Sequence, residues 1–434
     1  MNKMLIKGGR VIDPLNKRDG IFDVLIEKGK IKDIKESIEL EDVEKIKAEG
    51  LLVMPGLVDM HVHLREPGFE YKETIESGTK SAAAGGFTTI ACMPNTQPVI
   101  DDATLIEYIL LKARREGFVK VRPIGAISKG LQGVELASIG EMIEAGGVAF
   151  SDDGNPVVSS DLMKKAMEYA SMWGKTIISH CEDPSLSKIG LMNEGEMSTL
   201  LGMHGIPSAA EEIMVARDIA LARYTGCKVH IAHVSTAASV DLIRYAKAQG
   251  IPITAEVTPH HFSLTDREVD GYNANTKVNP PLRTQSDIDA LLLGLQDGTI
   301  DVIATDHAPH HRDEKMVEYQ LAPSGISGLE TAVPLAITNL IRKNILTPLE
   351  LVERMSLNPA KILGLQAGTL DVGQAADITI LDTETEEIVD SSKFYSKGKN
   401  TPLHGKPLYG KVHYTLVNGR IVKDIKGVYR GGQR

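Results

Sequence analysis

The sequence predicts an α/β fold: a (β/α)₈ barrel of the TIM type, with a small β-rich domain formed by the N- and C-terminal segments. Between residue 53 and about residue 360, short β-branched segments alternate with longer segments of helical pattern. Eight strands that alternate with helices over this length are typical of such a barrel. The predicted strands are 53–63, 87–94, 119–128, 148–153, 175–182, 228–235, 252–258 and 300–306.

The segments between these strands carry helical signals. Residues 104–117, 161–174, 210–226 and 239–250 each end in glycine, which commonly follows the last residue of a helix. The alternative is a doubly wound open sheet, which would require a glycine-rich phosphate-binding turn after the first strand. The first strand is instead followed by HVHLRE (61–66), which favours the barrel.

Both ends of the chain contain short strand patterns separated by turns. The segments KGGRVID (7–13) and VNGRIVK (417–423) resemble each other. Alternating apolar residues bounded by Gly, Asn and Asp are typical of strands joined by tight turns. We therefore expect residues 1–52 plus 365–434 to form one small β-sandwich-like domain, and residues 53–364 to form the catalytic barrel domain.

Composition excludes several classes of protein. The 434 residues carry a net charge of −10 without a basic stripe, so the electrostatic footprint of a nucleic-acid-binding protein is missing. No window approaches the ~18 consecutive apolar residues of a membrane span. The three cysteines are widely spaced, which argues against a disulfide framework and for a reducing cytoplasm. We expect a cytoplasmic protein with neither nucleic acid nor membrane as a partner.

Histidines, acids and amides gather at the C-terminal ends of the predicted strands, where such a barrel places its active site. These ends read HVHLR, MPN, FSDDG, SHCED, AHVS, TPHH and TDHAPH. Residues i and i+2 of a strand share a face, so His61 and His63 point the same way and can bind one cation. Together with His180, His233 and Asp306 they offer nitrogen and oxygen donors suited to Zn²⁺ or a similar ion.

Five donors exceed the three protein ligands of a usual mononuclear catalytic zinc site. A second ion is therefore expected if one more group bridges the two. Asp152 or Asp153 could be that bridge. Adjacent residues of a strand face opposite ways, so only one of them should point inward, and spacing alone does not decide which.

Structural roles compete with these functional ones. Asp306 could simply pair with Arg65, and Arg65 with Glu66, but the position of Arg65 two residues after His63 favours the site. One of the paired aspartates is expected to cap the turn at Gly154. A lone histidine near a strand end is usually a hydrogen-bonded structural residue. We expect this of His204, His230, His260, His261, His311, His404 and His413.

These motifs resemble the amidohydrolase superfamily and, within it, the dihydroorotase family of its cyclic amidohydrolase branch. The superfamily pattern G-x-x-D-x-H-x-H occupies residues 56–63. The narrower resemblance covers nearly the whole chain in order. It consists of HVHLREPG, MPNT, SDDG, SHCED, AHVST, VNPPLR, TDHAPH and SGISGLET.

The resemblance implies a reversible, metal-dependent cyclisation of N-carbamoyl-L-aspartate to L-dihydroorotate with loss of water, in de novo pyrimidine biosynthesis. It implies two Zn²⁺ ions bridged by Asp153. The metal ligands it implies are His61, His63, Asp153, His180, His233 and Asp306. The substrate contacts it implies are His63, Arg65, Asn95, Asn279, His310, Ser324 and Gly325. Many relatives bridge their metals with a carboxylated lysine on the fourth strand, but the segment GVAFSDD (147–153) contains no lysine.

Asp306 is the expected catalytic residue, because a carboxylate there could accept a proton from water and pass it to the ring nitrogen. A hydantoinase, dihydropyrimidinase or allantoinase is the rival function. Arg65, Asn95 and His310 suit a carboxylate that most of those substrates lack. A non-catalytic scaffold of the same fold is a second rival, although it would be expected to lose metal ligands, and all six positions are filled.

The segment 307–328 is long and polar and contains several Gly and Pro residues. It is expected to be a mobile loop that closes over substrate, the alternative being an ordinary surface loop. The sequence leaves open whether the chain forms a homodimer or associates with aspartate carbamoyltransferase.

Overall fold

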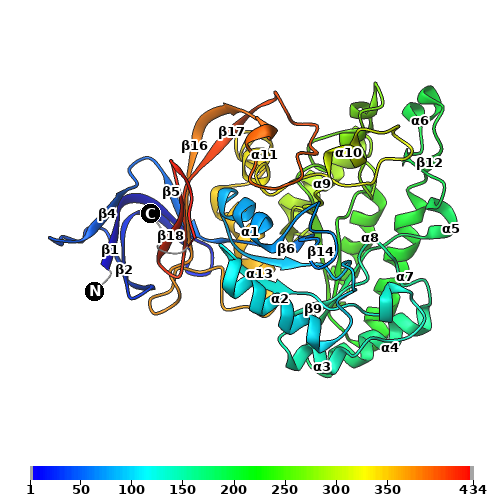
Figure 1. Cartoon of the computed structure of the whole chain (residues 1–434), viewed down its shortest axis with the longest axis horizontal. Helices are drawn as coiled ribbons and strands as arrows, with labels where there is room; N and C mark the ends of the chain where they lie inside the picture. The colour runs from blue at the N-terminus through cyan, green and yellow to red at the C-terminus, as the bar shows by residue number, and fades with distance from the viewer. Residues whose placement is uncertain (1–2, 431–434) are drawn as a thin grey trace.

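The computed structural model of the chain describes residues 3–430 (Figure 1). A β-rich part lies at one end of the molecule and a barrel surrounded by helices at the other. No helix within the described residues has the length and apolar character needed to cross a membrane.

Eight parallel strands form a closed barrel within the described part of the chain, which confirms the predicted (β/α)₈ fold. Strands β6-β7-β8 form one sheet and β15-β14-β13-β10-β9 another. Single parallel bridges, Gly125 to Phe150 and Val62 to His307, join the two sheets and close the ring. The barrel strands are β6 (Leu57–Val62), β7 (Phe87–Cys92), β8 (Lys120–Pro123), β9 (Ala149–Phe150), β10 (Thr176–Ser179), β13 (Val229–Ile231), β14 (Ile253–Val257) and β15 (Val302–Ile303).

The prediction of one continuous strand over 53–63 is wrong. Residues Leu52–Pro55 form a separate strand, β5, which pairs with strands outside the barrel. The chain changes sheets at Gly56, where an added Cβ would lie 2.2 Å from the side chain of Thr88. Only glycine fits this close approach to the neighbouring strand, so the apolar run is divided between two sheets.

Helices cover the outside of the barrel. The four helices predicted from sequence are confirmed as α2 (Ala103–Glu116), α4 (Ser160–Ser171), α7 (Ala209–Thr225) and α8 (Ala237–Ala248). The side chains of Asp102, Ser159 and Thr236 accept hydrogen bonds from the first turns of α2, α4 and α8, which fixes where these helices begin. The other helices are α1 (Ile75–Ala84), α3 (Ile139–Glu144), α5 (Pro184–Ser187), α6 (Glu196–Leu201), α9 (Gln285–Asp297), α10 (Arg312–Lys315), α11 (Ala332–Ala336), α12 (Pro348–Val352) and α13 (Asn358–Ile362).

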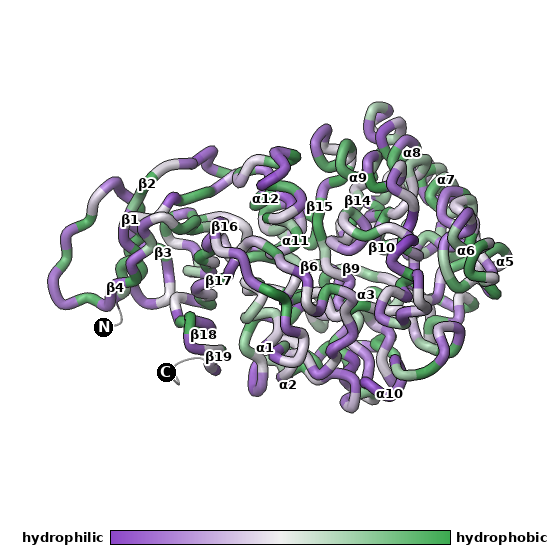
Figure 2. The backbone as a smooth tube through the Cα atoms, turned by 90° about the horizontal axis from the view of Figure 1, so that it is seen from above, coloured by the Kyte–Doolittle hydropathy of each residue, from purple (hydrophilic) through white to green (hydrophobic). Residues whose placement is uncertain are grey.

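Strands from both ends of the chain share one sheet. Its order is β19-β18-β17-β16-β5-β1-β2-β3, with β4 paired to β1. The two ends therefore lie together at the β-rich end of the molecule (Figures 1 and 2). The domain boundaries and the sandwich-like packing stay predictions. The strands are β1 (Lys3–Asp13), β2 (Arg18–Glu27), β3 (Lys30–Lys35), β4 (Glu44–Lys47), β16 (Ile378–Ile388), β17 (Pro407–Val417), β18 (Arg420–Asp424) and β19 (Gly427–Val428). A separate pair, β11 (Met192–Asn193) and β12 (Gly205–Ile206), lies between α5 and α7.

Three apolar cores hold this architecture. Met60, Ala91 and Ile178 belong to the core inside the barrel. A larger core packs the outer faces of the barrel strands against the helices, and a third lies in the β-rich sheet. Because the strands are buried on both faces, they read as continuous apolar runs, and the helices alternate between polar and apolar stretches (Figure 2).

Candidate active site

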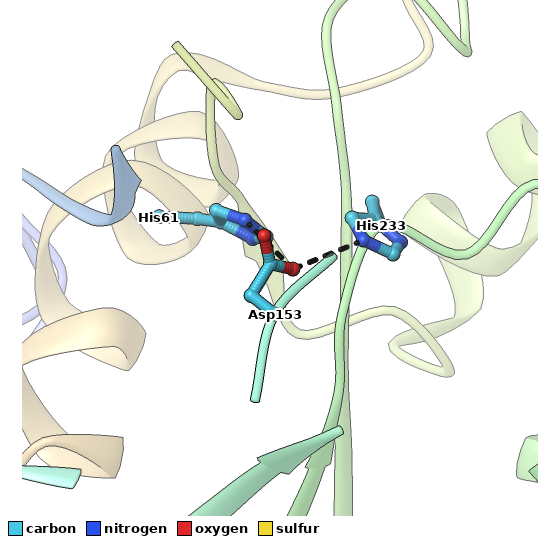
Figure 3. A group of neighbouring side chains, drawn as sticks. All are labelled: His61, Asp153 and His233. Carbon is cyan, nitrogen blue, oxygen red and sulfur yellow. Dashed lines mark ion pairs between the residues drawn. The ribbon is translucent and has the colours of Figure 1, made fainter. Parts of the chain in front are cut away.

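The six predicted metal ligands converge at the C-terminal end of the barrel. All six side chains are buried. His61 is the second-last residue of β6 and His63 follows this strand, while Asp153, His180, His233 and Asp306 follow β9, β10, β13 and β15. Figure 3 shows His61 and His233 pointing toward Asp153 from opposite sides. Their convergence follows from the parallel ring, which brings the carboxyl ends of all strands to one rim.

Asp153 lies at the centre of this group. Its Oδ1 is 3.3 Å from His61 Nε2, 3.5 Å from His233 Nε2 and 3.6 Å from His180 Nδ1. Its Oδ2 is 3.5 Å from His63 Nε2. One carboxylate therefore faces four imidazoles, which is the geometry of a group that joins two clusters.

Asp306 completes the cluster on the side of β6. Its Oδ1 is 3.0 Å from His63 Nε2 and 3.5 Å from His61 Nε2. The donor atoms of His61, His63 and Asp306 lie within 4.8 Å of one another, and so do those of His61, Asp153 and His233. No ion pair joins Asp306 to Arg65 within residues 3–430, so the purely structural role for Asp306 is not the one observed.

Three atoms of the predicted ligands have no hydrogen-bond partner in the described part of the chain: His61 Nε2, Asp153 Oδ1 and His233 Nδ1. The first two lie 3.3 Å apart at the centre of the cluster. A buried polar atom without a partner is costly, and a cation between these two atoms would satisfy both. Nitrogen and oxygen donors in this number, held at strand ends, suit a divalent ion such as Zn²⁺. The residues present therefore fit a metal centre.

The electrostatics of the cluster favour positive charge at its centre. Burial alone would lower the pKa of His61, but Asp153, Glu256 and Asp306 together raise it well above its usual value. Burial would likewise raise the pKa of Asp306, yet His61 and His63 hold it at about 2. The pKa of Asp153 is held well below its usual range by His61 and His233, against the effect of burial. Both aspartates are thus carboxylates at neutral pH, ready to bind a cation.

Asp152, the neighbour of Asp153, points elsewhere. Its Oδ1 accepts hydrogen bonds from the backbone N–H groups of Ile127 (2.7 Å) and Ser128 (3.0 Å), and its Oδ2 accepts one from Ser128 Oγ. Burial raises the pKa of Asp152 to about 6. Asp152 therefore ties the loop after β8 to the loop after β9, while Asp153 faces the histidines.

Two glutamates behind the histidines were missed from the sequence. Glu256 of β14 is 2.5 Å from His61 Nδ1 and 3.1 Å from His230 Nε2, and it is fully buried. Glu182 is 2.9 Å from His180 Nε2. Carboxylates in this position fix the ring orientation and tautomer of a metal-binding histidine. The sequence did contain a sign of Glu256, which is an acidic residue within the strand segment ITAEV. Because charged residues are rarely buried without a partner, an acid in such a strand suggests a specific contact.

Three of the predicted substrate contacts form a polar cluster beside the metal ligands. Arg65 Nη2 lies 3.3 Å from His310 Nε2, which is 2.8 Å from the backbone oxygen of Ser324. Lys72, which was not predicted, places its Nζ 3.4 Å from His310 Nδ1. Burial and the charge of Arg65 lower the pKa of His310 to about 2, so this ring is neutral and sits between two cations. The cluster can attract a carboxylate.

The remaining predicted contacts lie around this cluster. Asn95 Oδ1 is 2.9 Å from His63 Nδ1. Asn279 donates to Glu182 at 2.9 Å and so lies on the other side of the histidines, away from Arg65. Gly325 has φ of +145°, and a Cβ there would lie 2.6 Å from the backbone oxygen of Ala308. Only glycine fits at that turn.

Most of the histidines expected to be structural are placed as such. His230 contacts Thr254 and Glu256, and His261 contacts Thr258 and the backbone oxygen of Pro280. His260 differs, because its buried Nε2 has no hydrogen-bond partner within the described residues. His204, His311 and His404 are exposed, and His413 lies 3.8 Å from Asp382.

The segment 307–328 is anchored at several points. Asn400 Nδ2 donates to the backbone oxygens of Ala308 (3.0 Å) and Gly325 (2.9 Å), which ties both ends of the segment together. The buried Nζ of Lys315 donates to the backbone oxygens of Ala274 and Pro323. Between these anchors, residues 311–314 and 316–318 are largely exposed. Closure over a ligand stays a prediction.

Three of the predicted site residues have left-handed backbone conformations that non-glycine residues rarely adopt. The φ angles are +61° at Arg65, +33° at His233 and +45° at Asp306. Such conformations persist when the surrounding structure enforces them, and they concentrate at functional sites.

Comparisons with known proteins agree with the barrel fold. An L-hydantoinase (dihydropyrimidinase) structure from Arthrobacter aurescens superposes with a TM-score of 0.89 at 28% identity, covering 99% of this chain and 97% of that one. The barrel, the buried histidine–aspartate cluster at its rim and this likeness define an enzyme of the cyclic amidohydrolase class.

Sequence relatives narrow the class. A dihydroorotase from Acetivibrio thermocellus is 59% identical over 419 residues, covering 96% of this chain and 98% of that protein. One from Ruminiclostridium cellulolyticum is 56% identical over 417 residues, covering 96% and 97%. A family model described as Dihydro-orotase-like matches residues 50–239. The chain belongs to the dihydroorotase family.

Proposed function

We propose that the protein is a dihydroorotase, which interconverts N-carbamoyl-L-aspartate and L-dihydroorotate with loss or gain of water. Among the observations, the placement of Asp153 within 3.6 Å of four histidines carries the proposal, because it supports a two-ion centre built without a lysine. Relatives named dihydroorotase at more than half identity over nearly the full chain support this reaction over hydantoin hydrolysis.

Two Zn²⁺ ions are proposed at the centre, bridged by Asp153. His61, His63 and Asp306 would hold one ion, and His180 and His233 the other. When bound, such ions polarise a carbonyl group and lower the pKa of water toward neutrality.

Asp306 is proposed to move the proton. In the hydrolytic direction its carboxylate accepts a proton from the attacking water and donates it to the departing ring nitrogen. In the biosynthetic direction it accepts a proton of the ureido nitrogen as that nitrogen attacks the carbon of the protonated side-chain carboxyl group, and donates this proton to the hydroxyl oxygen that leaves as water. Its low pKa keeps Asp306 ionised at neutral pH.

Arg65 and its neighbours are proposed to hold the substrate's α-carboxylate. The guanidinium forms two parallel hydrogen bonds to a carboxylate and stays charged at any working pH. Asn95, Asn279, His310, Ser324 and Gly325 are proposed to complete the pocket, with His63 at its metal-facing side. Hydantoins without a carboxylate would not use this group of residues.

A substrate panel tests the function. The purified protein is assayed with N-carbamoyl-L-aspartate, L-dihydroorotate, hydantoin and allantoin, before and after chelation and after Zn²⁺ is added back. We expect turnover of the first two only, lost on chelation and restored by Zn²⁺. Turnover of hydantoin without turnover of dihydroorotate would show that the proposed substrate is wrong.

Replacing Arg65 with methionine is expected to raise the KM for dihydroorotate by about 10²-fold, because a charge-assisted contact to a carboxylate is worth roughly 1.5–3 kcal/mol. The neighbouring half-buried Glu70→Gln variant is the control, since within the described residues the Glu70 carboxylate accepts a hydrogen bond only from the backbone N–H of Gly68. Steady-state kinetics separate KM from kcat. An unchanged KM in the Arg65 variant would show that Arg65 does not contact the substrate.

Replacing Glu256 with glutamine is expected to weaken metal affinity or activity by about 10- to 100-fold, because His61 loses the carboxylate that orients it. Metal content and kcat are measured on the same samples. A second variant, His230→Gln, keeps Glu256 but removes its other partner and should have a smaller effect. If both variants bound metal and turned over like the parent, the positioning role of Glu256 would be excluded.

Limited proteolysis checks closure of the 307–328 segment. Cleavage is expected within the exposed residues 311–313, 316–318 and 320–321, and dihydroorotate should slow it at least several-fold if the segment closes over substrate. Cleavage at the same rate with and without substrate would show that the segment is an ordinary surface loop that does not close over substrate.

A further inference from the structure

A second cavity lies on the opposite side of the barrel from the metal ligands. It has a volume of about 1200 Å³ and is lined by the C-terminal part of α2, the beginning of β8 and the turns of the β-rich sheet. Strand β8 begins at Lys120, and the metal ligands follow the other ends of the parallel strands. Figures 1 and 2 show β18 beside this end of the barrel. The cavity is therefore separate from the catalytic site and lies between the sheet and the barrel.

The lining of this cavity is rich in basic residues, although the chain as a whole is acidic. Of the described residues that line it, seven are basic and one, Glu44, is acidic. The chain as a whole has 48 basic and 58 acidic residues. Basic residues from segments far apart in the sequence thus converge on one concave surface, where field lines concentrate and attract anions.

Five of these cations form no ion pair with any described residue. Lys3 is paired with Glu27 at 3.4 Å and Lys120 with Asp377 at 2.5 Å. The other five have no ion pair and no side-chain hydrogen bond within residues 3–430. They are Lys28, Lys30, Arg114, Arg122 and Arg420. The Nε of Arg122 is moreover buried without a hydrogen-bond partner. Uncompensated like charges repel one another, so a bound anion would stabilise this surface.

Apart from Asn418, the rest of the lining is apolar or glycine. Leu110, Phe118, Val119, Val121 and Ile421 contribute side chains from both the barrel and the sheet. A lone inorganic anion would gain nothing from such a floor. A pocket with charged groups at its edge and apolar groups beneath is typical of sites for small organic ligands.

We propose that this cavity binds a small organic anion carrying linked phosphates, of the nucleoside triphosphate class, between the β-rich sheet and the barrel. The five uncompensated cations would bind the phosphates, with Arg114 and Arg122 able to contact phosphate oxygens in pairs. The apolar floor would accept the base. The limited volume of about 1200 Å³ favours a small ligand over a nucleic acid, which would need an extended basic surface.

Calorimetric titration of the full-length protein with ATP, inorganic tripolyphosphate and adenosine tests the proposal. We expect ATP to bind most tightly, tripolyphosphate more weakly, and adenosine hardly at all. The variant Arg114→Gln/Arg420→Gln should weaken ATP binding at least tenfold and leave dihydroorotate turnover unchanged.

A matched control removes the same number of charges elsewhere. Arg115→Gln/Arg223→Gln replaces two exposed arginines at the ends of α2 and α7 that do not line the cavity and form no ion pair in the described residues. It should bind ATP like the parent, and any heat from chelation at the metal centre is common to all three proteins. Equal weakening in both variants, or equal binding of ATP and tripolyphosphate, would overturn the proposal. Tighter binding of a single-stranded oligonucleotide than of ATP would overturn it as well.

Discussion

Replacing Asp306 with asparagine is expected to lower kcat for dihydroorotate by about 10³-fold or more, with only a small change in the midpoint of thermal unfolding. The amide cannot accept the proton of the attacking water, and a general acid–base group contributes roughly 10²- to 10⁴-fold. The Oδ1 of an asparagine at this position can still contact His63 and His61, whose Nε2 atoms lie 3.0 and 3.5 Å from Oδ1 of Asp306. The fold should therefore tolerate the change.

Metal content must be measured in the same Asp306 variant, because Asp306 is also a proposed ligand. The bulk of the loss is expected to persist in samples with full Zn²⁺ occupancy. A fully loaded variant that turns over within about tenfold of the parent would exclude proton transfer by Asp306. A variant that loses both metal and activity, and regains both when Zn²⁺ is added, would assign Asp306 to metal binding alone.

Substitutions at the adjacent residues Asp153 and Asp152 are expected to have different effects. Asp153 is expected to matter for activity, and Asp152 for the stability of the fold. Asp153→Asn should reduce activity by about 10²-fold or more, because it removes the negative charge that faces four histidines and bridges the proposed ions.

Asp152→Ala should show the opposite pattern. It removes three hydrogen bonds from a buried carboxylate and leaves the N–H groups of Ile127 and Ser128 without partners, so the free energy of unfolding should fall by about 3 kcal/mol. Bound Zn²⁺ per folded molecule should stay near the parent value. Denaturant unfolding and metal analysis of both variants distinguish the roles. Loss of metal in the Asp152 variant and retention in the Asp153 variant would reverse the assignment.

The sequence predicted the barrel and the convergence of its ligands because both depend on periodicity. Parallel strands buried on both faces give apolar runs, and the ends of those runs must share a rim. His61, His180 and His233 could thus be grouped although they lie far apart in the chain. The division of the predicted first strand at Gly56 was missed, because an apolar run carries no sign of which sheet each half joins.

The supporting groups were harder to predict for a physical reason. Glu256 acts through its contact with His61, and this contact depends on the twist and stagger of β14 against its neighbours rather than on any local pattern. Lys72 lies on a loop, and its approach to His310 is set by tertiary packing. The choice between Asp152 and Asp153 depended on which carboxylate lay near backbone N–H donors of another loop. The hydrogen bonds from Ile127 and Ser128 identify Asp152 as the neighbour that turns away from the histidines.

The sheet shared by the two ends of the chain has a consequence for biosynthesis on the ribosome. Strands β1 and β5 emerge first, but their neighbour β16 is translated only after the entire barrel. Until then the nascent chain exposes an open strand edge at β5, a surface prone to pairing with other chains. Chaperone dependence and aggregation during expression should therefore respond to changes at the β5–β16 edge far more than to changes of equal thermodynamic cost inside the barrel.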